Sequence, residues 1–246
     1  MNAAKYLLIG GGLGSGEAAK TIRRIDPEGT IVIASEELHL PYNRPPLSKE
    51  FLRGEQDSQS LLVSSAEFYH ENRIGTHLGL KAVALDTVNK CVSFAGDETI
   101  GFEKLLIATG GSPITLSIPG TDKNGVHYLR TIDDSAAIRV EATEGKRAVI
   151  IGGGFIGIEM AASLREKGVE VTVIEAMPQI WPKFTNVLLA NYFQSYCEGK
   201  GIVFVTGQTV ESIQGGERVS KVVTDGGQEL GCDFVCIAVG IRPRVE

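Results

Sequence analysis

Two glycine-rich segments of this chain have the spacing of residues that binds a pyrophosphate. They are Gly10-x-Gly12-x-x-Ser15 and Gly152-x-Gly154-x-x-Gly157. In such a motif the first glycine allows a tight turn, the second lets a phosphate approach the backbone, and the following helix offers N–H groups to the anion. Ser15 stands where the motif has its third glycine, and serine is small enough to be tolerated there. The alternative is that each segment is only a structural glycine turn.

The elements needed to position these motifs are repeated along the chain. We expect strand 6–9, helix 16–25 and strand 30–34 around the first motif, and strand 148–151, a helix to about 167 and strand 170–174 around the second. An acid after the second strand can hold ribose hydroxyls, and Glu36 and Glu175 have that place. The order predicts an α/β fold of two Rossmann-type, three-layer (ββα) units that bind dinucleotides.

The remaining pattern predicts two domains, residues 1–117 and 118–246. The boundary falls in residues 113–125, which are rich in proline, glycine, serine and threonine. Short β segments are expected before it, ending in a strand at 105–108. Beyond the second unit we expect a helix at 187–200, a hairpin of 210–213 with 219–223, and a buried strand at 234–239.

Composition and charge exclude several classes of function. The 246 residues are 43% hydrophobic, and the net charge of −6 argues against nucleic acid or an anionic membrane as the main partner. No apolar run reaches the roughly 18 residues that a membrane span needs. The first strand begins too early to leave room for a leader peptide, so a cytoplasmic location is expected.

A longer segment makes the chain resemble a known family. This segment is Leu40-Pro-Tyr-Asn-Arg44-Pro-Pro-Leu-Ser-Lys49. Two shorter segments carry the same resemblance, namely Ala108-Thr109-Gly110 and Ala238-Val-Gly240-Ile-Arg-Pro243. The chain resembles, over its whole length of 246 residues, the flavoprotein family of putidaredoxin and rubredoxin reductases and the apoptosis-inducing factors. The alternative interpretation is a proline-rich loop with solvated cations.

The resemblance implies an FAD site in the first unit. The residues it assigns to FAD are Gly10, Gly12, Ser15, Glu36, Arg44, Lys49, Thr109 and Gly110. Arg44 is expected along the cofactor, and Lys49 beside the reactive edge of the flavin.

The second unit is predicted to bind NADH through Gly152, Gly154, Gly157, Glu175 and Gly240. The Glu175 carboxylate can accept from a ribose 2′-OH and would repel a 2′-phosphate. No arginine stands at 176–179 to favour that phosphate, and the next cation is Lys183. The resemblance implies that Phe155 gates or stacks on the nicotinamide, although an aromatic side chain there could be part of the core.

Glu159 is expected to contact Lys49, again by resemblance. It lies on the first turns of the second glycine-motif helix. The alternative is an acid that only complements the helix dipole. Lys49, Glu159 and Phe155 are the candidate catalytic residues.

The cysteines, histidines and lone tryptophan receive no catalytic role. No Cys-x-x-Cys or Cys-x-x-x-x-Cys follows either glycine motif, so a flavin-linked disulfide relay is excluded. Cys232 and Cys236 are expected on one side of a strand, about 13 Å apart and too far to bridge. The histidines and cysteines do not have the spacing of metal ligands. Trp181 is expected to have a packing role only.

The function implied is that of an NADH-dependent FAD oxidoreductase, which passes a hydride from NADH to FAD and then electrons to a ferredoxin- or rubredoxin-type acceptor protein. In the family a second FAD segment and a third domain follow the NAD domain. Neither follows Glu246, so the first unit is expected to be incomplete and the chain a fragment. The alternative is an apoptosis-inducing-factor-like redox sensor or an NADH-binding module without significant turnover. A homodimer is left open.

Overall fold

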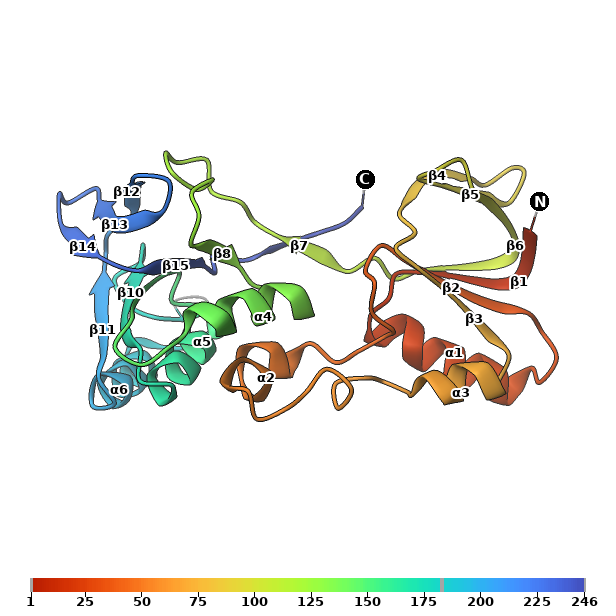
Figure 1. Cartoon of the computed structure of the whole chain (residues 1–246), viewed down its shortest axis with the longest axis horizontal. Coiled ribbons are helices and arrows are strands. Elements are labelled where there is room, and N and C mark those ends of the chain that lie inside the picture. The colour runs from red at the N-terminus through yellow and green to blue at the C-terminus, as the bar shows by residue number, and fades with distance from the viewer. Residues whose placement is uncertain (1, 182–183, 246) are drawn as a thin grey trace. The chain divides into compact units, whose positions relative to one another are not determined.

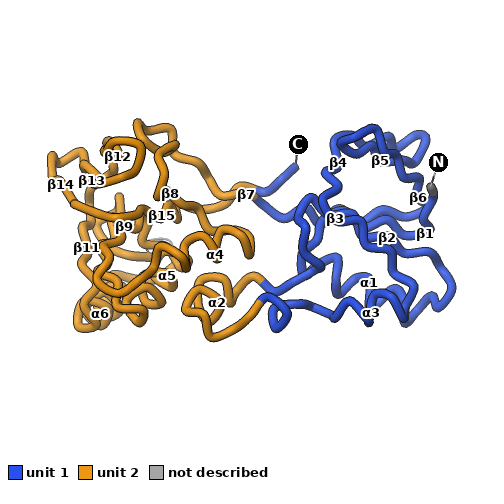
Figure 2. Tube along the Cα trace, in the orientation of Figure 1, with its two compact units in different colours: residues 1–43, 58–111, 243–246 blue, residues 44–57, 112–242 orange. Residues whose placement is uncertain are grey.

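The protein consists of two compact units (Figure 2). A computed structural model describes residues 2–181 and 184–245. Unit 1 comprises residues 1–43, 58–111 and 243–246, and unit 2 comprises residues 44–57 and 112–242. The segment 44–57, which carries the Arg-Pro-Pro-Leu-Ser-Lys sequence, therefore belongs to unit 2. The expected division into domains after residue 117 stays a prediction.

Unit 1 is built on a six-stranded sheet with the order β3-β2-β1-β6-β5-β4. Its strands are β1 (Asn2–Ile9), β2 (Ile31–Ser35), β3 (Ile74–Leu78), β4 (Ala82–Asp86), β5 (Cys91–Phe94) and β6 (Thr99–Ile107). Strands β3, β2, β1 and β6 are parallel, whereas β4 and β5 are antiparallel. Helices α1 (Leu13–Ile25) and α3 (Ala66–Glu71) lie on one face, and β4 and β5 curl over the other (Figure 1).

Successive residues of β1 point to opposite faces of this sheet and so enter two separate cores. Leu8 packs with Ala19 and Tyr69 on the helical side. Leu7 and Ile9 pack with other apolar residues on the side of β4 and β5. A sheet covered on both faces is the three-layer arrangement that the sequence predicts.

Unit 2 is built on a five-stranded parallel sheet with the order β11-β10-β9-β15-β8. Its strands are β8 (Val126–Tyr128), β9 (Arg147–Ile151), β10 (Glu170–Glu175), β11 (Ile202–Thr206) and β15 (Phe234–Ile237). Helices α4 (Ile132–Glu141), α5 (Phe155–Glu166) and α6 (Val187–Glu198) cover one face. The antiparallel strands β12 (Val210–Gly215), β13 (Val219–Thr224) and β14 (Glu229–Gly231) cover the other (Figure 1). The α/β fold with two Rossmann-type units is confirmed.

Short elements complete the fold. They are the 3₁₀ turn η1 (Pro45–Ser48), helix α2 (Glu50–Arg53), and the paired strands β7 (Gly111–Pro113) and β16 (Ile241–Pro243). Leu52 of α2 is fully buried in the core that α4 and α5 share. Burial of this leucine explains why segment 44–57 is part of unit 2.

Two expectations from the sequence are corrected. Helix α1 begins at Leu13 and not at residue 16, because Gly12 has an extended backbone and is itself the N-cap. Cys232 and Cys236 do not share a face of a strand. β15 begins at Phe234, so the alternation of a strand does not extend back to Cys232, and the two cysteines belong to different cores.

Candidate functional site

The first glycine of each motif turns the chain at the point where the strand order of its sheet reverses. Gly10 follows β1, and Gly152 follows β9. Their φ angles are +112° and +109°, a region that favours glycine. A Cβ on Gly10 would lie 2.2 Å from the Ala108 carbonyl oxygen, and one on Gly152 would lie 2.6 Å from that of Ala238. Both turns therefore require glycine. Both lie at the crevice in which α/β proteins bind ligands.

The second glycine of each motif faces open space. Gly12 and Gly154 are the N-caps of α1 and α5, and a Cβ on either would meet no heavy atom within 4 Å. A phosphate can thus approach the free N–H groups at each helix start, which fits the dinucleotides expected at both turns. The third position differs between the copies. A Cβ on Gly157 would lie 2.0 Å from the Gly152 carbonyl oxygen, whereas Ser15 is accommodated and fully buried.

Glu175 is oriented by the backbone of its own turn. It ends β10, and its carboxylate accepts from Gly153 N–H at 2.7 Å through Oε2 and from Met177 N–H at 2.9 Å through Oε1. Bonds from N–H groups to a carboxylate are among the stronger hydrogen bonds in proteins. The ribose acid predicted for NADH is therefore held beside the second glycine turn.

Glu36 does not occupy the equivalent place in unit 1. Strand pairing sets Ile9 opposite Ala34 and Ile151 opposite Ile174, so the residue that corresponds to Glu175 is Ser35. The sequence could not reveal this shift, because the two helix-to-strand loops differ in length. The role of Glu36 toward FAD stays a prediction.

The Glu36 carboxylate pairs with two cations of unit 1. Arg244 lies at 2.5 Å and Lys81 at 3.2 Å. Burial opposes the charge of Glu36, but hydrogen bonds from Arg244 and Lys81 outweigh it and lower the pKa of the carboxyl.

The sequence alone did not reveal a contact of the next residue, Glu37. Its Oε2 accepts from the hydroxyl of the fully buried Tyr42 at 2.6 Å. The Pro-Tyr pair of the long motif was the signal that could have pointed to it.

The segments after β6 and β15 repeat one another. Ala108 N–H donates to the Ile9 carbonyl, and Ala238 N–H donates to the Ile151 carbonyl, each at 2.8 Å. Within unit 1 the Thr109 hydroxyl donates to the Arg244 carbonyl at 2.9 Å, and the Gly110 carbonyl accepts from Arg244 N–H at 3.0 Å. Both predicted FAD residues thus lie beside the first glycine turn, and their role stays a prediction.

The motif segment 44–49 is anchored by two buried serines of unit 2. The Ser135 hydroxyl donates to the Leu47 carbonyl, and the Ser163 hydroxyl donates to the Ser48 carbonyl, both at 2.7 Å. Arg44 Nη1 donates to the Arg130 carbonyl at 2.6 Å. The segment is therefore fixed on α4 and α5, and the alternative of a solvated proline-rich loop is wrong.

The predicted contact between Lys49 and Glu159 is confirmed. Lys49 Nζ lies 2.7 Å from Glu159 Oε2, and the Ser48 hydroxyl donates to the same oxygen at 2.6 Å. Lys49 Nζ also donates to the Pro45 carbonyl at 3.3 Å. About a third of each charged side chain is exposed, at 35% and 31%, so water screens the pair. Ser48, which the sequence did not single out, orients the carboxylate together with the lysine.

We expect a modest but measurable coupling between Lys49 and Glu159. In a double-mutant cycle of Lys49→Ala and Glu159→Ala, the double variant should unfold no more easily than the worse single variant. The coupling should be about 0.5–1 kcal/mol, because the pair is one-third exposed. The exposed pair Glu17–Lys20 in α1, at 3.0 Å, is the matched control and should show less. Strict additivity in denaturant unfolding would show that the contact contributes nothing.

A cavity of about 730 Å³ opens at the carboxyl ends of β9, β10 and β15, entirely within unit 2. This volume is in the range of cofactor sites. The predicted residues that line it are Arg44, Gly152, Gly154, Phe155, Glu175 and Gly240, and Ser48 lines it as well. Gly157, Lys49 and Glu159 do not line the cavity. Four of the five residues predicted to bind NADH, all but Gly157, thus line one cavity, and Arg44, which was predicted to lie along FAD, lines it as well.

Comparison with known proteins shows to which family the chain belongs. The model of the pyridine nucleotide-disulphide oxidoreductases matches residues 4–246. The chain belongs to this family. Its members are NAD(P)H-dependent flavoprotein oxidoreductases, and the ferredoxin reductases are the group that it resembles.

Among curated members of the family, the probable ferredoxin reductase CtmF of Castellaniella defragrans is 34% identical over 99% of this chain and 60% of its own length. A crystallised ferredoxin reductase from Rhodopseudomonas palustris is 34% identical with a TM-score of 0.93, over 98% of this chain and 60% of the other. A putidaredoxin reductase, solved in covalent complex with putidaredoxin, has the same TM-score at 26% identity, over 97% of this chain and 58% of the other. The chain thus spans about 60% of the length of these relatives.

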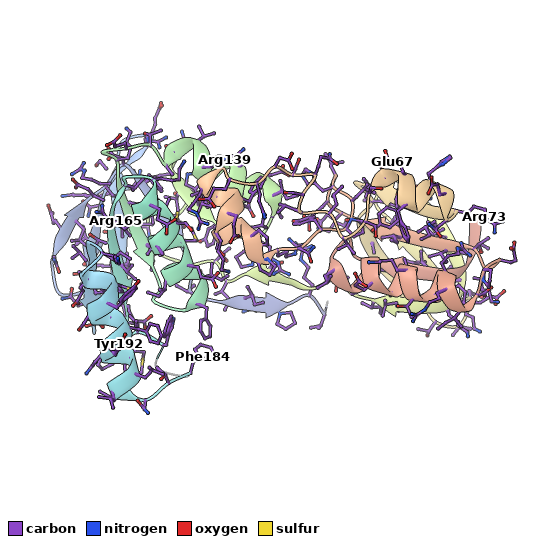
Figure 3. The ribbon with its side chains drawn as sticks, turned by 90° about the horizontal axis from the view of Figure 1, so that it is seen from below. Glu67, Arg73, Arg139, Arg165, Phe184 and Tyr192 are labelled. Carbon is purple, nitrogen blue, oxygen red and sulfur yellow. The ribbon has the colours of Figure 1, made fainter. Side chains whose placement is uncertain are left out.

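Phe155 lies at the cavity of this family member and not in its core. Its side chain is 49% exposed, and its ring lies 4.7 Å from that of Phe184 and 5.4 Å from that of Trp181. Phe184 is beside one end of α5 (Figure 3). Trp181 also contacts Phe193 and packs on the core, as expected, although its indole Nε1 is buried without a partner among the described residues. A gating role for Phe155 stays a prediction, and Lys183 lies outside the described residues.

The cysteines of this chain do not supply the disulphide in the family's name. All four are free, and three of them are buried. Burial raises the pKa of the Cys232 thiol to about 12 and raises that of Cys236 further, so neither forms a thiolate at neutral pH. In residues 2–181 and 184–245 no cluster of side chains could hold a metal ion. No helix in the same ranges is long and apolar enough to cross a membrane.

Proposed function

We propose that this chain is the nucleotide-binding part of an NADH-dependent flavoprotein reductase that serves a ferredoxin- or rubredoxin-type acceptor in the cytoplasm. The observation that carries the proposal is the cavity of unit 2, at which Glu175 is held by two backbone N–H groups. FAD, held by Gly10, Gly12 and Glu36, would supply the capacity to take a hydride from NADH and to release electrons one at a time. The covalent complex of the similar putidaredoxin reductase with putidaredoxin supports an acceptor protein of this kind.

The residues of unit 2 have separable tasks in this proposal. The start of α5, at Gly154, receives the pyrophosphate, and Glu175 receives the ribose hydroxyls. Phe155 covers the nicotinamide end of the cavity. Ser48, Lys49 and Glu159 hold a fixed arrangement of charge at the end of segment 44–49. A charge arrangement that is already oriented needs no reorganisation when a hydride is transferred.

An NADH-binding module or redox sensor without significant turnover is the second candidate. It is favoured by one observation, namely that the described cavity lies wholly within unit 2 and needs no residue of unit 1. Steady-state oxidation of NADH with a dye acceptor separates the two candidates. A reductase reduces the dye in proportion to its bound flavin, whereas a binding module shows saturable NADH binding and no reduction.

NADH should bind at least about 10-fold more tightly than NADPH, which corresponds to about 1.4 kcal/mol. The reason is that the Glu175 carboxylate, held beside the ribose site, accepts from a 2′-OH but repels a 2′-phosphate. Titration calorimetry with both dinucleotides measures the ratio.

The variant Glu175→Ala should narrow the ratio mainly by improving the binding of NADPH. The matched control is Glu170→Ala, at the exposed start of the same strand, which should leave the ratio unchanged. Equal affinities of the unmodified chain for the two dinucleotides would contradict the assignment of Glu175.

A further inference from the structure

Gln208 lies beside the ribose acid, and none of the tasks proposed above uses its side chain. Strand β11 pairs with β10 so that Thr206 stands opposite Glu175, and Gln208 comes just after this pair. The Gln208 N–H donates to the Glu175 carbonyl at 3.4 Å. Gln208 also lines the cavity. A base attached to a ribose that Glu175 holds is therefore only one sugar ring away from this glutamine.

The side-chain amide of Gln208 has unused hydrogen-bonding capacity. Its Oε1 is buried and has no partner in the described part of the chain. Among the buried side-chain atoms without a partner there, only those of Gln208 and Trp181 belong to residues that line the cavity. An oxygen in this situation destabilises the ligand-free protein, because it has lost water and gained no donor. Such a cost at a cavity wall points to a ligand that supplies the donor.

The turn between β13 and β14 provides the room for this amide. A Cβ on Gly226 would lie 3.0 Å from Gln208 Oε1 and 3.2 Å from its Cδ, so a side chain at Gly226 would press on the amide. The last torsion of a glutamine is soft, because an sp²–sp³ bond has broad minima. The amide can therefore turn from the Gly226 backbone toward the cavity that its stem lines.

We propose that Gln208 recognises the adenine base of the dinucleotide, which makes it a specificity-determining residue of the NADH site proposed above. Oε1 accepts from the exocyclic amino group of adenine, and Nε2 donates to N7 of the adjoining five-membered ring. Adenine and a glutamine amide are complementary in this way, since each presents one donor beside one acceptor. A base with an oxo group at that position offers Oε1 no donor and leaves it unpaired.

The experiment compares NADH with its hypoxanthine analogue, in which an oxo group replaces the amino group of adenine. Titration calorimetry on the 246-residue chain should show NADH binding about 10-fold more tightly, the equivalent of about 1.4 kcal/mol. In Gln208→Met, which keeps the length of the side chain without its amide, the two ligands should bind within about 2-fold of each other. Gln228→Met is the matched control, because Gln228 is exposed in the turn between β13 and β14, next to which the Gln208 amide lies, and it should keep the full ratio.

A second readout separates recognition from a structural role. Because Gln208 Oε1 has no partner in residues 2–181 and 184–245, Gln208→Met should leave the thermal midpoint of the ligand-free chain unchanged or raise it. A lower midpoint would show that the amide stabilises the fold, and it would overturn the inference.

The remaining outcomes are also distinct. Equal binding of NADH and its analogue to the unmodified chain, or an unchanged ratio in Gln208→Met, would overturn this inference and leave the proposed function intact. Binding of neither dinucleotide would contradict the proposed function and the inference with it.

Discussion

Gly157→Ala is expected to destabilise unit 2 by about 3 kcal/mol and to lower its thermal midpoint by roughly 10 °C. A Cβ at this position would lie 2.0 Å from the Gly152 carbonyl oxygen, and that oxygen belongs to the backbone of the glycine turn. A backbone atom cannot swing aside as a long side chain can, so the turn and the start of α5 must separate. Circular dichroism during heating measures the loss, and NADH binding should fall with it.

Gly154→Ala is the matched variant, and it should weaken NADH binding while leaving the stability of unit 2 nearly unchanged. Gly154 has φ −75° and an extended ψ, which alanine adopts, and its Cβ would enter open space. Stability should therefore change by no more than about 1 kcal/mol, the usual size of an N-cap effect. The methyl group would stand where a phosphate approaches the helix N-terminus, so NADH should bind at least about 10-fold more weakly. If Gly154→Ala bound NADH normally, the pyrophosphate would not lie at this turn.

The 246-residue chain is expected to bind NADH and yet to purify largely colourless, without useful reduction of a dye. The cavity proposed to bind NADH lies wholly within unit 2, whereas the relatives that suggest flavin chemistry are longer than this chain.

The absorption spectrum of the purified chain measures retained flavin directly. Titration with free FAD, followed by flavin fluorescence, then tests whether unit 1 has a weak site that purification empties. Its control is Gly12→Val, which should abolish any such binding because it fills the space before α1. A chain that purifies with one tightly held FAD and oxidises NADH would contradict this prediction, and it would show that unit 1 forms a flavin site alone.

Features that depend on neighbouring residues along the chain could be predicted from the sequence. The two glycine turns, the strands before them and the helices after them follow from local periodicity and from the φ angles that only glycine adopts freely. The place of Glu175 at the end of β10 could be predicted because the apolar pattern defines the length of that strand. The contact of Lys49 with Glu159 came from resemblance to a family and not from spacing, since these residues are far apart in the chain.

Only the tertiary structure decided which residues meet across long separations in sequence. The register of β2 against β1 places Ser35, and not Glu36, where Glu175 stands in the other unit, and loop length alone does not reveal such a register. Segment 44–57 joins unit 2 because Ser135 and Ser163 bond its carbonyl groups and Leu52 enters its core. Periodicity reports which side of an element is buried, but not which partner buries it. The buried Oε1 of Gln208, which has no partner among the described residues, is visible at the cavity wall for the same reason only after the chain has folded.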